Sequence, residues 1–192
     1  LYELLEKIEK EFEEISLQPL FLKYQSYYDE GMGIIKCLDI LMRSCVELIS
    51  VEQPQWEMIA ARFLNMKLHL LVDEQCKLHH LDSFYDKLCY LEKEGYYGSY
   101  ILENYSKADV DELQTCLKEE NDDLFTYSGL DLLYKRYLIS SHQHELLETP
   151  QEMFMGIAMH LAIPEKNNRL FWVKKFYELL SSLKVTVATP TM

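Results

Sequence analysis

The feature that most constrains this chain is the recurrence of apolar side chains at every third or fourth position. One such series consists of Ile34, Leu38, Leu41, Cys45 and Leu48. This spacing places the apolar side chains on one face of an α-helix. Glycine and proline, which interrupt helices, number only 6 and 5 among 192 residues. The sequence therefore predicts a mainly α fold with a helical bundle-like N-terminal region.

Caps and breaks give approximate limits to the expected helices. Ser106 with Asp109, and Thr149 with Glu152, have the spacing of a capping box, and Asp82 is a further expected cap. A small hairpin is expected at 138–148, and the β-branched residues after Lys184 predict a strand. The expected helices are 1–14, 18–28, 34–48, 54–71, 82–94, 110–118, 122–137, 150–163 and 167–182.

The charge balance disfavours two classes of partner. Lysine and arginine number 19 and aspartate and glutamate 32, a formal net charge of −13. Binding to duplex nucleic acid or to an anionic membrane surface depends on a basic face, so neither partner is expected. No apolar run reaches the roughly 18 to 20 residues of a membrane-spanning helix. The five cysteines are scattered and odd in number, which favours reduced thiols and a cytoplasmic setting.

The residues taken alone contain no complete catalytic set. His69, Cys76 and His80 would share a face of a continuous helix and could hold a metal ion, but no second ligand motif accompanies them, so a polar helical surface is favoured. Gly31 and Gly33 form a lone glycine pair that follows no strand, which favours a turn between helices over a phosphate-binding loop. No catalytic and no metal-binding residue is therefore predicted within this chain.

Four segments, in order, carry a resemblance to a known family. They are ELISVEQPQWEMIAAR at 47–62, DDLFTYSGLDLLYKRYL at 122–138, ETPQEMFMGIAM at 148–159 and FYELLSSLKVTVATPTM at 176–192. Together they resemble the N-terminal part of the large (α) subunit of class I ribonucleotide reductase. The chain has no initiator methionine, and it looks like a piece of something longer.

The resemblance implies a domain order. Residues 1–71 would be a partial ATP cone, 72–182 the N-terminal helical domain, and 183–192 the first strand of an α/β barrel that is not included. Thr189 matches the family's substrate-binding Thr or Ser after that strand. Gly33, Cys37 and Leu70 depart from the family at three cone positions, so no effector-binding residue is assigned and a degenerate cone that binds neither ATP nor dATP is expected.

The resemblance also implies an activity for the full-length protein. It would be a ribonucleoside-diphosphate reductase that makes deoxyribonucleotides for DNA synthesis by thiyl-radical chemistry. Its expected partners are a small (β) radical-generating subunit with a metal-radical cofactor, a second α subunit and the ribonucleoside diphosphate substrate. None of the five cysteines matches the family's redox cysteines, so this piece would be an inactive scaffold that binds no cofactor.

Two other interpretations rest on the residues alone. A stand-alone acidic helical protein-interaction module would explain the lack of a catalytic set. A small metal-binding regulator would be built on His69, Cys76 and His80.

Overall fold

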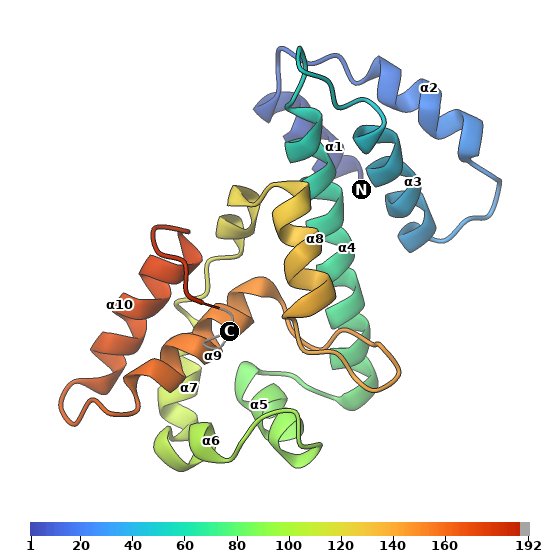
Figure 1. Ribbon diagram of the computed structural model, residues 1–192. Coiled ribbons are helices and arrows are strands. Elements are labelled where there is room, and N and C mark those ends of the chain that lie inside the picture. Colours follow the sequence, from blue (N-terminus) through green and yellow to red (C-terminus); the bar gives the residue numbers. More distant parts are fainter. Residues whose placement is uncertain (189–192) are drawn as a thin grey trace. The chain divides into compact units, whose positions relative to one another are not determined.

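The computed structural model describes residues 1–188, which divide into two compact units (Figure 1). The first unit contains Leu1–Leu68 and Phe125–Lys135. The second contains His69–Leu124 and the described residues from 136 onward. The boundary at residue 68 falls inside α4 (Trp56–His79), so this helix contributes to both units. Among residues 1–188, no helix has both the length and the apolar character needed to cross a bilayer.

The first unit is helical. Its helices are α1 (Tyr2–Glu11), α2 (Gln18–Tyr27), α3 (Ile34–Val46), the first half of α4 and α8 (Tyr127–Arg136). The apolar faces form its core, with Ile8, Leu20, Leu38, Ile59 and Phe63 fully buried. The guanidinium group of buried Arg62 pairs with the Glu11 carboxylate and so joins α4 to α1.

The second unit is built around α9 (Pro150–Ala162), in which almost every residue is buried. Helix α9 packs against α10 and also contacts α6 and the 3₁₀ helix η1. The remaining elements of this unit are the second half of α4, α5 (Phe84–Lys93), α6 (Tyr100–Asn104), α7 (Lys107–Gln114), η1 (Glu119–Leu124) and α10 (Arg169–Ser181).

The structure confirms the mainly α fold and both capping boxes, at Ser106 and at Thr149. Several helix limits were wrong; the helix expected at 110–118, for example, is α7 at Lys107–Gln114. Helix α4 continues past residue 71 to His79, because residues 72–79 contain no glycine or proline, and it ends where His80 takes a positive φ of 56°. Ser83, rather than Asp82, caps α5 by accepting a hydrogen bond from the Asp86 N–H.

Two other regions also differ from expectation. Asp122 does not begin a long helix; it lies buried in η1, and α8 starts only at Tyr127. The expected hairpin is reduced to one antiparallel bridge between Ser140 and Leu146. Short helix α6 was not predicted.

The expected strand after Lys184 is not formed within residues 184–188. The N–H groups of Lys184 and Val185 instead donate to the Leu179 carbonyl at the end of α10. A β-branched segment adopts strand structure only when another strand supplies its hydrogen-bond partners. The rest of that segment lies outside the described residues.

Candidate functional site

The segment Glu148–Glu152 joins the hairpin to the start of α9. The Thr149 hydroxyl accepts a hydrogen bond from the Glu152 N–H, and the Glu152 carboxylate accepts one from the Thr149 N–H. Pro150 occupies the first turn, where no N–H is required. The local sequence therefore starts α9 at a defined residue and orients Glu148, Gln151 and Glu152 in three directions.

Gln151 belongs to a buried chain of hydrogen bonds. Its amide nitrogen donates to Asp122 at 2.7 Å, and its amide oxygen accepts from the Tyr177 hydroxyl, also at 2.7 Å. The other oxygen of Asp122 lies 3.2 Å from Nε2 of His69, and the Tyr177 hydroxyl accepts from the Lys118 N–H. Burial alone would lower the pKa of His69, but the hydrogen bond to Asp122 and its charge raise it overall. These polar groups are hydrogen-bonded to one another, and the bonds connect α4, η1, α9 and α10.

Glu152 also binds Lys87 of α5. The ammonium group lies 2.6 and 2.7 Å from the two carboxylate oxygens. Both side chains are nearly buried. The capping box and the ion pair thus use the same carboxylate.

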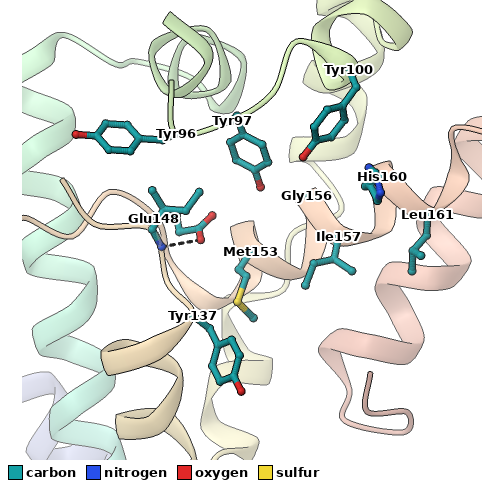
Figure 2. A pocket seen from close by; sticks show the side chains of 11 residues that line it. Tyr96, Tyr97, Tyr100, Tyr137, Glu148, Met153, Gly156, Ile157, His160 and Leu161 are labelled. Carbon is teal, nitrogen blue, oxygen red and sulfur yellow. Dashed lines mark hydrogen bonds between the residues drawn. The ribbon is translucent and has the colours of Figure 1, made fainter. Parts of the chain in front are cut away.

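Glu148 points into a cavity of about 560 Å³, which Figure 2 shows. Its wall contains four tyrosines, His160 and several apolar side chains. One carboxyl oxygen accepts a hydrogen bond of 2.9 Å from the Ile139 N–H, and the second has no hydrogen-bond partner among the described residues. The tyrosines are Tyr96, Tyr97, Tyr100 and Tyr137.

Burial is the main cause of the raised pKa values of side chains in this pocket. Glu148 is only 2% exposed, and its burial, aided by the neighbouring charge of Glu152, raises its pKa to about 8. The Ile139 N–H and the charge of Lys87 oppose that rise. Burial, with Glu148 nearby, also raises the pKa of Tyr97 well above its usual value. At neutral pH the pocket therefore contains an acid that is mostly protonated and uncharged.

The family-implied positions lie on different elements. Gly33 precedes α3 as its N-cap, beside a cavity lined by residues 29–36, and Cys37 is buried in the first turns of α3. Leu70 lies on α4 and is half-buried. Thr189 lies outside the described residues, so its role stays a prediction.

The three residues of the metal hypothesis are not assembled into a ligand set. His69 bonds to Asp122, whereas His80 is exposed beyond the end of α4. Among the described residues, no group of three His, Cys, Asp or Glu side chains is placed to hold a metal ion.

Comparisons with known proteins assign the chain to a family. Residues 123–192 match the family profile described as ribonucleotide reductase, all-alpha domain. The ribonucleoside-diphosphate reductase subunit alpha of Treponema pallidum (strain Nichols) is 46% identical over 181 residues, which is 94% of this chain. The chain belongs to the ribonucleotide reductase large-subunit family. It corresponds to an N-terminal portion of that subunit.

Other members of the ribonucleotide reductase family align over a similar range. The ribonucleoside-diphosphate reductase subunit alpha of Enterobacteria phage T4 is 34% identical over 90% of the chain, and the ribonucleoside-diphosphate reductase 1 subunit alpha of Escherichia coli (strain K12) is 23% identical over 93%. The chain spans only 21% of the Treponema protein and 23% of each of the other two. It therefore covers about one fifth of the length of these relatives.

The pocket was not predicted from the sequence, because no acidic residue stood in a recognisable catalytic or binding motif. One signal was present in the sequence. Glu148 directly follows the apolar pair Leu146 and Leu147, both of which are buried. An acid that adjoins an apolar run just before a helix cap is a candidate for burial.

Proposed function

We propose that this chain is part of a class I ribonucleoside-diphosphate reductase, in which the full-length large subunit replaces the ribose 2′-hydroxyl with hydrogen. The observation that carries the proposal is the 46% identity to a protein named as that reductase's subunit alpha, over 94% of the chain. The proposed substrate is a ribonucleoside diphosphate. The radical would come from a metal cofactor in a separate small subunit, and the reducing cysteines would belong to other parts of the large subunit. The proposed compartment is the cytoplasm.

Within that enzyme, residues 72–182 would be a scaffold. The hydrogen-bonded chain from His69 to Tyr177 and the Lys87–Glu152 pair support this role, because their polar groups bind one another across five elements, α4, α5, η1, α9 and α10. Residues 183–192 would lead into the catalytic barrel. The large subunit would act as a homodimer together with the small subunit.

Residues 1–71 would be a degenerate ATP cone that binds no effector. The cavity lined by residues 29–36 supports this proposal, since the described part of its wall has a single basic residue, Lys36, beside two acids, Asp29 and Glu30. A polyphosphate site needs several cations or N–H donors. Titration of a protein with its native N-terminus with dATP should show no micromolar binding, and micromolar binding would refute a degenerate cone.

The substrate role of Thr189 is tested in the full-length protein. With the small subunit present, Thr189→Ala should raise the KM for the ribonucleoside diphosphate more than tenfold, because a hydroxyl that binds the substrate is lost. Thr186→Ala, three residues earlier in the same segment, is the matched control and should change KM less than twofold. Equal effects of the two substitutions would contradict a specific role for Thr189, and the absence of ribonucleotide reduction by the unmodified protein would contradict the proposed function.

A further inference from the structure

The structure points to a second ligand site, separate from the proposed substrate position and independent of the family assignment. We propose that the pocket around Glu148 binds a small primary alkylammonium compound, with the ammonium group on Glu148 and the alkyl chain along the apolar wall. The volume of about 560 Å³ lies within the range of small-molecule sites in proteins.

The polar groups nearest the proposed ammonium position are the Glu148 carboxyl group and the Tyr97 hydroxyl, whereas Tyr100 packs against His160 with 4.9 Å between the ring centroids. Oε2 of Glu148 has no hydrogen-bond partner among residues 1–188, although the side chain is almost completely buried. In Figure 2 the hydroxyls of Tyr97 and Tyr100 point inward, on the side of the pocket where Gly156 lies. A primary ammonium group has three N–H donors, and carboxylate and hydroxyl oxygens are suitable acceptors for them.

The charges around the pocket favour a cation over an anion. Neither lysine nor arginine is present among the described residues of its wall, whereas Glu148 is an acid. Aromatic rings attract cations electrostatically, and four tyrosines line the cavity. The net charge of −13 on the chain also attracts cations from solution. Among the described residues of this wall, a nucleotide phosphate would find no lysine or arginine to bind.

The other end of the pocket is suited to an alkyl chain. Met153 and Ile157 project from α9 into the wall, and Leu161 lies one turn further along. Gly156 leaves the space that the Tyr97 hydroxyl occupies, because a Cβ there would lie 2.1 Å from that oxygen. The pocket therefore offers a carboxyl group and an apolar surface formed by α9, which suit the two parts of an alkylammonium ion, and His160 lies on the side away from Glu148.

Binding of the cation displaces the proton of Glu148. The carboxyl group releases its proton to the solvent, and the resulting carboxylate pairs with the ammonium group, so charge balances within the pocket. The charged or titratable groups that face Glu148 are Lys87 and Glu152, which pair with each other, and Tyr97. His160 is the other titratable group of the wall besides the tyrosines.

The test compares three ligands of equal chain length by isothermal titration calorimetry with the 192-residue protein. Hexylammonium should bind at least tenfold more tightly than hexan-1-ol, and hexanoate should bind more weakly than the alcohol. About one proton should be released per hexylammonium bound at pH 7, measured in buffers of different ionisation enthalpy. The affinity should rise about tenfold from pH 6 to pH 7, and His160→Gln should retain this dependence.

Two variants identify the site. Glu148→Gln keeps an acceptor for the Ile139 N–H and should reduce hexylammonium affinity at least tenfold. Glu120→Gln makes the same substitution at an exposed position of η1 and should change the affinity less than twofold. The proposal is overturned if hexylammonium does not bind, if the alcohol or hexanoate binds as tightly, or if Glu148→Gln has no greater effect than Glu120→Gln.

Discussion

The side chains of Lys87 and Glu152 are 6% and 13% exposed, so their ion pair is largely removed from water. Transfer of two charges from water has a large unfavourable free energy, which a close and fully bonded geometry offsets. The Glu152 carboxylate meets that requirement, because it accepts from Lys87 and from the Thr149 N–H. Loss of one partner would leave the other charge buried and uncompensated.

Substitution of Lys87 by methionine is therefore expected to lower the free energy of unfolding by about 3 to 5 kcal/mol. Lys93→Met is the matched control, because that side chain is 82% exposed and should change stability by less than about 0.5 kcal/mol. Urea unfolding of both variants measures the difference. Equal stability of the two variants would show that the buried pair contributes no more than a surface lysine.

The raised pKa of Glu148 predicts a specific pH dependence of stability. The folded protein holds this proton up to about pH 8, whereas the unfolded chain releases it near the ordinary value of 4.5. The folded state thus binds more protons between these values, so the contribution of Glu148 to stability is fully present below about pH 4.5 and is lost as the pH rises towards 8. Glu148→Gln removes this dependence.

Between pH 5 and pH 7 the wild-type protein should lose roughly 2 kcal/mol of unfolding free energy relative to the Glu148→Gln variant, since one pKa unit corresponds to about 1.4 kcal/mol. Chemical denaturation at both pH values measures the change. The unfolding free energy of the Glu120→Gln variant should change between these pH values by the same amount as that of the wild type. A constant difference between wild type and Glu148→Gln across this range would mean that Glu148 titrates normally in the folded state.

Most contacts between individual side chains could not be predicted from the sequence. The Lys87–Glu152 pair joins positions 65 residues apart, and no local pattern indicates such a pairing. His142 and His144, in contrast, lie in the short turn of the expected hairpin, and both are exposed. Exposure in a short turn is a local property, whereas partners for buried charges are set by tertiary packing.

At the scale of elements, α9 depends on its first residues. The Thr149 hydroxyl and the Glu152 carboxylate each satisfy a backbone N–H that the helix leaves without a partner. Thr149→Ala should lower the unfolding free energy by about 1 kcal/mol, whereas Thr149→Ser should lose less than half of that, because serine also caps. Thermal or urea unfolding of the two variants distinguishes them. If both lose the same amount, packing of the Thr149 methyl group rather than capping accounts for the effect.

The elements that the sequence predicted well are those with local signals. Both capping boxes are formed, since cap and acceptor lie three residues apart and no distant group is required. Asp122 was wrongly predicted to start a helix. Its carboxylate instead forms hydrogen bonds with His69 and Gln151, which are remote in sequence. Residues 184–188 have strand propensity, but two of their N–H groups donate hydrogen bonds to a carbonyl at the end of α10 instead of to another strand.

At the scale of the whole molecule, the segments that carry the family resemblance have identifiable places in the structure. The segment 148–159 includes the α9 cap, the buried hydrogen-bond chain and the core of the second unit. These are structural roles, which explains why the family could be recognised in a chain that contains no predicted catalytic residue. The pocket around Glu148 was not predicted, because its wall comes from residues between Tyr96 and Leu161 that only the fold brings together.

The central claim is that these residues are an N-terminal portion of a much longer reductase subunit. The matched relatives are about five times as long as the aligned region, since 181 residues are 21% of the Treponema protein. The most direct test is the intact mass of the native polypeptide isolated from its source. We expect a mass several times the 22.8 kDa of this chain. A native mass close to 22.8 kDa would contradict the proposed enzyme and would favour a stand-alone helical protein-interaction module of the same ancestry.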